Sequence, residues 1–315
     1  MSPVRVLAQS CCSPATTPSD AINHPAPPAG KLQIGIYAEH YALAGGRRGT
    51  EDFTYPGDRH SSAQIATLSG YFGVTNRFAV AGLVPFNRRT RSDVATTGER
   101  VARKSTGLGD VSLLGYANLL SRLSRREWTV GAGVKLATGM SRAEDGSGEL
   151  PQELQPGTGA NDGLFTSTYS QALGPFTASA GLTWRITGTL TKIEVISGSS
   201  EEVRRQYRFG NEVLYGTSVA WSPDAVWGFE FDVRGRHAEP DEGTRLNADG
   251  TTTGVRETLP STGGERVWLA PTLRFVLPET KAAVSLGVLV PVYENLRGSQ
   301  LGSQLGLRFS VEGQP

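Results

Sequence analysis

Long stretches of this sequence alternate strictly between apolar and polar residues. From Phe176 to Thr187, the even positions are apolar and the odd positions are polar or small. From Trp227 to Arg234, aromatic residues and valine alternate with glycine, glutamate, aspartate and arginine. Side chains of a β-strand point alternately to opposite faces, whereas a helix repeats every ~3.6 residues, so a period of two predicts β-strands. The sequence therefore predicts an all-β fold whose strands each have one apolar and one polar face.

Twelve segments of the chain follow this pattern. They are residues 31–43, 62–74, 78–88, 106–120, 127–138, 163–173, 176–188, 207–221, 226–237, 265–277, 282–293 and 301–311. Their lengths, roughly 11 to 15 residues, exceed the ~5–6 residues usual in globular proteins and suffice for a tilted membrane crossing, which needs ~9–11. An even number of strands of this length predicts a transmembrane antiparallel up-and-down β-barrel of about 12 strands.

The connections between these segments alternate between short and long. The long ones cover residues 44–61, 89–105, 139–162, 189–206, 238–264 and 294–300. Such alternation is typical of barrels in the outer membrane of Gram-negative bacteria, where short turns are periplasmic and long loops extracellular. We therefore expect that location, with residues 139–162 and 238–264 outside the cell and the turn at 222–225 in the periplasm.

Large aromatic residues flank several of the short connections. Six of them share the apolar face on the phase of the alternation: Phe72, Phe78, Trp128, Phe176, Trp221 and Trp227. Aromatic rings favour the boundary between lipid and water, and membrane barrels place girdles of them there. We expect these six residues to form such a girdle, because a soluble β-sandwich gives no reason to ring one end with outward-facing aromatics.

The polar face carries charged residues that we expect to line the lumen. They are Glu39, Asp110, Lys135, Arg185, Arg208, Glu212, Glu230, Asp232, Arg234, Arg236, Arg266, Arg274 and Arg308. Eight are basic and five are acidic, which leaves two interpretations open. One is a polar path that favours small anions or zwitterions, and the other is a set of mutually neutralising pairs without selectivity. Twelve strands lie between filled eight-stranded barrels and open 16-stranded porins, so we expect a narrow or partly plugged lumen.

The first 30 residues differ from the rest. Residues 1–10 resemble the end of a secretory signal with too short an apolar part, and residues 12–30 are rich in proline. We expect a residual signal and flexible periplasmic arm over 1–30, followed by the barrel over 31–315. Cys11 and Cys12 are the only cysteines, and with His24 they form a conceivable soft-metal site. A thiol pair in a flexible leader is the simpler interpretation, so we expect no metal and no cofactor.

Composition narrows the class of partner. The formal net charge is +1, which argues against a nucleic-acid binder, since these usually carry a strongly basic patch. The absence of cysteine after residue 12 excludes zinc fingers and cysteine nucleophiles from the body of the chain. The expected partners are outer-membrane lipid, lipopolysaccharide and a small-molecule solute, and the oligomeric state stays open.

Several short motifs resemble those of a known family. They are Val84-Pro85-Phe86, Gly107-Leu108-Gly109-Asp110, Leu154-Gln155-Pro156-Gly157-Thr158-Gly159 followed by Asp162, and Gly174-Pro175-Phe176. On these residues the chain resembles the predicted outer-membrane β-barrel transporter family linked to the meta-pathway of phenol degradation, over about residues 31–311. The resemblance implies a barrel that transports small molecules across the outer membrane, and it does not specify the solute.

These observations favour a channel for passive passage of small molecules, aromatic or anionic solutes among them, rather than an enzyme. One alternative is a non-conducting structural or binding barrel whose surface loops contact lipopolysaccharide or a partner. The least favoured alternative is a lipid-active barrel enzyme, which needs a serine and a histidine together on the outer wall. His40 is expected on the lipid face and Ser69 on the lumen face, so the two are not expected to meet.

Overall fold

The structure is a computed structural model. It describes residues 27–55, 57–94, 98–120, 125–146, 148–195, 202–246, 252–280 and 282–313. The expectations for residues 1–26, including Cys11, Cys12 and His24, lie outside the described residues. Within the described ranges, no helix is long and apolar enough to cross a membrane.

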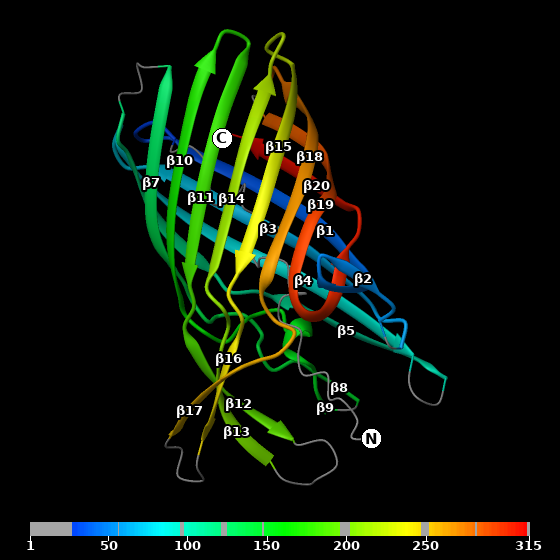
Figure 1. Cartoon of the computed structure of the whole chain (residues 1–315). Coiled ribbons are helices and arrows are strands. Elements are labelled where there is room, and N and C mark those ends of the chain that lie inside the picture. The colour runs from blue at the N-terminus through cyan, green and yellow to red at the C-terminus, as the bar shows by residue number, and fades with distance from the viewer. Residues whose placement is uncertain are drawn as a thin grey trace.

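Twelve wall strands form a closed antiparallel barrel, which confirms the predicted fold class (Figure 1). The wall consists of β1 (Leu32–Gly49), β3 (His60–Gly73), β4 (Phe78–Val94), β5 (Arg100–Leu108) continued by β6 (Ser112–Asn118), β7 (Arg126–Lys135), β10 (Asp162–Leu173), β11 (Phe176–Ile186), β14 (Glu212–Trp221), β15 (Trp227–Ala238), β18 (Gly264–Leu277), β19 (Ala282–Ser303) and β20 (Gly306–Gly313). Each strand pairs with its neighbours in sequence order, and β1 pairs with both β3 and β20, which closes the ring.

The two faces of the wall differ as the alternation predicts. On β15, Phe229 and Phe231 point outward with exposed fractions of 48% and 52%, while Asp232 points inward and is only 7% exposed. Leu286 and Phe309 behave in the same way on β19 and β20. The barrel thus presents an apolar outer surface and encloses polar side chains, the reverse of a soluble fold.

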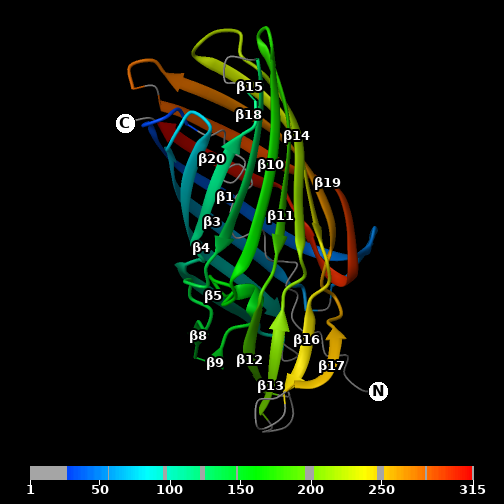
Figure 2. The same cartoon turned by 90° about the vertical axis from the view of Figure 1, so that its left-hand side faces the viewer.

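Several segments expected to be loops contain strands or a 3-10 helix. These are the parts of β1 and β4 next to the long connections, all of β2 (Glu51–Phe53), and the start of β5, together with β8 (Glu144–Asp145), β9 (Gly148–Glu149), the 3-10 helix η2 (Gln152–Leu154), β12 (Thr189–Val195), β13 (Glu202–Arg208), β16 (Glu242–Leu246) and β17 (Thr252–Thr258). β12, β13, β16 and β17 form a four-stranded sheet that projects from the long-loop end (Figure 2). Strand pairing outside a membrane needs no apolar outer face, so the alternation that identifies the wall is absent there.

Two boundaries in the wall also differ from expectation. The segment 207–221 is divided, because β13 ends at Arg208 and β14 begins at Glu212. Gly210 between them packs so tightly that a Cβ atom would lie 1.8 Å from the carbonyl oxygen of Glu239. Residues 294–303, which include the start of the predicted segment 301–311, belong to β19, whose last residues pair with Leu43–Gly49 of β1; β20 begins only at Gly306.

The prolines within the wall lie where the ladder of hydrogen bonds is interrupted. Pro85 on β4 faces the junction where β6 gives way to β5 as neighbour, and Gly109 donates its N–H to the Pro85 carbonyl there at 2.8 Å. Pro271 on β18 falls in a gap of the β18–β19 register, between Leu269 and Thr272, and Pro291 pairs with Trp268 next to a register shift. Proline lacks an N–H donor, so these interruptions accommodate it.

The short turns at the opposite end are stabilised locally. In the turn between β14 and β15, Asp224 accepts the backbone N–H groups of Val226 and Trp227, each at 2.8 Å. These hydrogen bonds to the carboxylate hold the pKa of Asp224 below its usual value.

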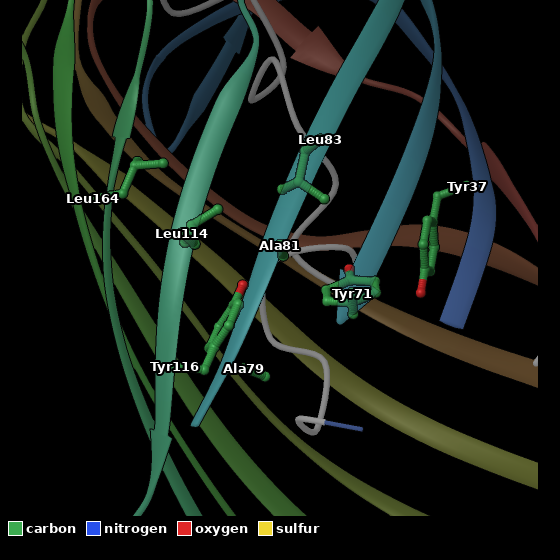
Figure 3. Packing of buried hydrophobic residues seen from close by; sticks show 8 residues of the cluster. All are labelled: Tyr37, Tyr71, Ala79, Ala81, Leu83, Leu114, Tyr116 and Leu164. Atoms are coloured by element: carbon green, nitrogen blue, oxygen red, sulfur yellow. The ribbon is translucent and has the colours of Figure 1, made fainter. Parts of the chain in front are cut away.

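One sector of the inner wall is apolar. A buried cluster there comprises Tyr37, Tyr71, Ala79, Ala81, Leu83, Leu114, Tyr116 and Leu164, contributed by β1, β3, β4, β6 and β10 (Figure 3). Residues 27–31 lie against the end of β3: the N–H of Gly30 donates to the Gly73 carbonyl at 2.7 Å, and Pro27 is buried. A Cβ atom on Gly73 would lie 2.0 Å from the carbonyl oxygen of Pro28, so only glycine permits this approach. The interior is therefore divided into an apolar sector and the charged sector described next.

Candidate functional site: the barrel lumen

A belt of alternating charges follows the inner wall near the long-loop end. It contains Asp110, Lys135, Asp162, Arg185, Glu212 and Arg236, which come from consecutive positions around the wall between β5 and β15. Lys135 Nζ lies 2.8 Å from Asp110 Oδ2 and 3.0 Å from Asp162 Oδ2. Arg185 lies 3.0 Å from Glu212, and Arg236 forms a further ion pair with the same glutamate. We call this set the charge belt.

The same level of the wall is completed by a second group on β18, β19 and β1. Arg266 Nε lies 3.5 Å from Glu294 Oε1, and Arg47 lies 3.4 Å from the other oxygen of Glu294. Arg266 also donates to Ser303 and to the Leu301 carbonyl, both at 2.8 Å. The pairing of opposite charges makes it possible to bury so many ionised groups inside a wall.

A segment of the connection between β7 and β10 folds back into the mouth of the barrel. This mouth segment, residues 150–160, includes Leu150 and Leu154, which are almost fully buried. Asn87 on the inner face of β4 donates to the Pro156 carbonyl at 2.6 Å, and Arg89 donates to the Glu153 carbonyl at 3.1 Å. The long-loop end of the lumen is thus narrowed by the chain itself.

The charge belt holds the mouth segment through one carboxylate. Asp110 Oδ2 accepts both the backbone N–H of Thr158, at 2.8 Å, and its hydroxyl, at 2.6 Å, in addition to Lys135. Its other oxygen accepts the N–H of Gly139 at 3.0 Å. A Cβ atom on Gly157 would lie 2.7 Å from the backbone of Gly139, so glycine is required where these segments cross. The sequence motifs around 84–86, 107–110 and 154–159 therefore meet at one place in the fold.

A second cluster lies deeper and bridges the lumen. Glu39 on β1 and Arg234 on β15, four strands apart in the wall, approach to 3.5 Å. Arg234 also pairs with Asp232, and Tyr41 donates to Glu39 at 2.7 Å. We call Glu39, Glu230, Asp232, Arg234 and Arg308 the cross-lumen cluster. Neighbouring strands cannot account for the contact between Glu39 and Arg234, so it spans the inside of the barrel.

Arg308 joins this cluster by lying along the inner wall. From β20 it reaches β15, where it is 3.3 Å from Asp232 and 3.7 Å from Glu230. On the way it passes over Gly287 of β19, where a Cβ atom would lie 2.9 Å from the Arg308 side chain. The glycine therefore makes room for the guanidinium to reach across two intervening strands.

On the short-turn side of the cross-lumen cluster, the lumen widens into a cavity of about 310 Å³. Its lining includes the hydroxyl residues Thr129, Thr168, Ser170, Thr177, Ser179, Ser218 and Ser222, together with Glu127, Glu230 and Arg274. Arg274 is exposed and has no acidic partner among the described residues, whereas Glu230 faces Arg308. We call this space the hydroxyl pocket. It offers many neutral hydrogen-bonding groups and one cation without a counter-ion.

The structure places most of the expected lumen residues on the inner wall, in three groups. Asp110, Lys135, Arg185, Glu212 and Arg236 lie in the charge belt, with Arg266 at the same level. Glu39, Glu230, Asp232, Arg234 and Arg308 form the cross-lumen cluster, and Arg274 lies in the hydroxyl pocket.

Arg208 alone lies elsewhere, in β13 of the projecting sheet, where it faces Glu242 at 3.4 Å. The six aromatic residues expected in a girdle, Phe72, Phe78, Trp128, Phe176, Trp221 and Trp227, are 42–56% exposed on the outer wall.

Some lumen residues were missed by sequence reasoning. Asn87 belongs to a predicted strand, but Arg89 and Arg91 lie beyond its predicted end, and Glu294 lies one residue beyond another. Continuing the inward phase of β4 through residue 91 identifies the two arginines. The inward fold of Glu153 and its ion pair with Arg91 has no such signal, because it depends on the path of a long connection.

The serine and histidine considered for a lipid-active enzyme do not come together. Ser69 on β3 pairs in register with Gly35 and donates its hydroxyl to the Gly35 carbonyl at 3.1 Å on the inner face. His40 lies five residues further along β1, on the opposite face of the wall. A nucleophile and base need hydrogen-bonding distance, which this arrangement does not provide.

Comparisons with known proteins address the fold. No family model matches the chain, and no curated protein matches it. The structure is similar to the crystal structure of an outer-membrane channel from Pseudomonas putida F1, with a TM-score of 0.68 and 14% identity over 95% of this chain and 99% of that chain. Two further structures are described as monoaromatic hydrocarbon channels. One is CymD, with a TM-score of 0.43 at 9% identity, and the other is a deletion mutant of TodX, with a TM-score of 0.49 at 11% identity. The match to CymD covers 91% of this chain and 89% of CymD, and the match to the TodX mutant covers 95% of this chain and 94% of the mutant. The fold is that of outer-membrane barrels.

Proposed function

We propose that this protein is an outer-membrane channel that passes small molecules by passive diffusion. The observation that carries the proposal is the closed barrel with an apolar outer face and an interior of charged and hydroxyl side chains. The lipid-facing side of a membrane barrel is apolar, whereas a polar interior can be occupied by water and by a water-soluble solute. On this proposal the long-loop end is extracellular and the six exposed aromatics form the periplasmic girdle.

The lumen supports a selective path rather than a wide pore. A solute entering from the short turns meets the hydroxyl pocket, whose volume of about 310 Å³ admits a molecule of monosaccharide or benzoate size. Arg274 supplies a cation for a carboxylate, which favours anionic solutes, as basic residues do in anion pores. Aromatic acids carry such a carboxylate on an aromatic ring, and the resemblance to the family linked to phenol degradation suggests an aromatic solute.

Passage beyond the pocket requires movement of the cross-lumen cluster. Glu39, Asp232 and Arg308 are each less than 10% exposed, so their ion pairs occupy the lumen at that level. An anion competes with Glu39 and Asp232 for the two guanidinium groups of Arg234 and Arg308. We propose that this exchange of partners is the selective step.

The same burial favours a second candidate, a barrel that does not conduct. The mouth segment is fixed by Asp110 and Asn87, and the cross-lumen cluster fills the lumen between the mouth segment and the short-turn end. A structural or binding role needs no open path, and surface loops would then carry the contacts with lipopolysaccharide or a partner.

Liposome swelling with the full chain tests the channel. Vesicles containing the wild type should take up benzoate and a monosaccharide but exclude a disaccharide, and Arg234→Ala/Arg308→Ala should admit all three faster. Arg77→Ala/Arg297→Ala removes two exposed arginines outside the lumen and should match the wild type. If the folded wild type and the lumen variant are equally impermeable, the non-conducting barrel replaces the channel.

A further inference from the structure

The outer face of the wall changes character abruptly where β3, β4 and β5 approach the long-loop end. Leu68, Phe86 and Leu108 are exposed there to 52%, 46% and 57%, and Phe86 pairs in register with Leu108. These side chains form the edge of the apolar outer surface in this sector. Any lipid acyl chain against this part of the wall ends near them.

One residue pair further along, the outward positions become basic and polar. Arg88 pairs with Thr106 on one side and Gln64 on the other, and all three are exposed. Lys104 is the next outward residue on β5, opposite Thr90. Arg88 and Lys104 are therefore diagonal neighbours on adjacent strands, about 7–8 Å apart, so their head groups can reach one small anion.

Neither cation is neutralised by a neighbour among the described residues. Arg100, the nearest other arginine on this face, is already paired with Asp58 at 2.6 Å. The hydroxyls of Ser62 and Thr90, 2.7 Å apart, add neutral donors beside Lys104. This contrasts with the lumen arginines, almost all of which face carboxylates.

The opposite sector of the outer wall differs at the same end. There the outward positions of β15, β18 and β19 carry His237, Glu265, Tyr293 and Asn295, and Tyr215 donates to Glu265 at 2.6 Å. These four positions include one acid and no lysine or arginine. Arg88 on β4 and Lys104 on β5 are thus the basic residues that directly follow the apolar edge in their sector.

We propose that Arg88 and Lys104, with Gln64 and Thr106, bind a phosphate group of lipopolysaccharide in the outer leaflet. The proposal rests on the proposed function, which places the long-loop end outside the cell. A phosphate accepts charge-assisted hydrogen bonds from both cations, while Phe86, Leu108 and Leu68 pack against the acyl chains of the same molecule. The adjacent apolar edge favours a lipid phosphate over free phosphate, because only the lipid uses both surfaces.

The test is binding of lipid A to the purified full chain, measured by native mass spectrometry. Wild type should bind diphosphorylated lipid A at least tenfold more tightly than dephosphorylated lipid A. In Arg88→Gln/Lys104→Gln this preference should fall to less than twofold. Arg77→Gln/Arg297→Gln, which removes the same charge from exposed positions elsewhere, should keep it. Circular dichroism and gel mobility confirm that each variant is folded.

Three outcomes would overturn the site: an unchanged preference in the double variant, an equal loss in the control variant, or displacement of lipid A by inorganic phosphate at equimolar concentration, which indicates a free-phosphate site. Swelling in vesicles without lipid A separates this inference from the channel. A barrel that binds lipid A as expected but passes no solute contradicts only the proposed function. A conducting barrel without the phosphate preference contradicts only this site.

Discussion

Placing an arginine on the outer face of β15 should destabilise the barrel by an amount set by its depth in the membrane. Phe231 is 52% exposed on the outer wall and lies between Trp227 at the short-turn end and His237 near the mouth. A strand rises about 3.3 Å per residue, and a tilt of about 40° leaves about 2.5 Å of depth per residue. Phe231 therefore lies about 10 Å from the level of Trp227, close to the middle of a ~25 Å apolar band.

Arginine near the midplane of a barrel costs about 2–4 kcal/mol, and near the interface about 0–1 kcal/mol. We therefore expect Phe231→Arg to lower the free energy of unfolding by about 2–4 kcal/mol and His237→Arg by about 0–1 kcal/mol. Glu230→Gln, next to Phe231 but on the inner face, removes one 3.7 Å ion pair of a half-exposed carboxylate and should cost less than about 1 kcal/mol.

Reversible urea unfolding of the full chain in phospholipid vesicles, followed by tryptophan fluorescence, measures the three differences. The reasoning is refuted if Phe231→Arg costs no more than His237→Arg. It is also refuted if Glu230→Gln is the most damaging of the three, because the inner and outer faces of β15 would then be exchanged.

Three other perturbations address the belt, the selectivity and the orientation. Lys135→Met should lower the free energy of unfolding by about 3–5 kcal/mol, since two buried carboxylates lose their shared cation, and a loss below about 1 kcal/mol in urea unfolding would contradict the belt. The reversal potential in a KCl gradient should show anion preference that falls in Arg234→Ala/Arg236→Ala; a cation-selective wild type would leave these arginines as structural partners of acids. In a chain whose native cysteines are replaced by serine, Val255→Cys should label with an impermeant reagent on intact cells and Asp224→Cys should not; the opposite pattern reverses the orientation.

The wall was predictable from the sequence because the membrane imposes the alternation. Within the apolar band, outward residues such as Phe229 and Leu286 must be apolar while inward residues face a polar lumen, so the period of two is clear. Beyond the band both faces are polar, and the signal disappears. The part of β4 beyond residue 88, from inward Arg89 to Val94, is therefore predicted as a loop although it continues the strand.

The charged residues of the lumen were predictable as a row, but their partners were not. The phase places Glu39 and Arg234 on the inner face, yet nothing in the sequence states that strands four positions apart meet across the barrel. The arrangement of Arg308 depends on a glycine at position 287, on a strand between the partners. The mouth segment depends on how a long connection folds back onto Asp110, which local pattern does not encode.

Single-channel recording across a planar lipid bilayer tests the central claim most directly. The purified full chain should insert and produce discrete conductance steps, and Arg234→Ala/Arg308→Ala should raise the step size by removing the two guanidinium groups of the cross-lumen cluster. Gel mobility of the purified protein, and its protection from protease after reconstitution into vesicles of the same lipid, verify that the barrel is folded and inserted. A folded, inserted barrel that stays silent in both forms would contradict the channel and leave a structural or binding role.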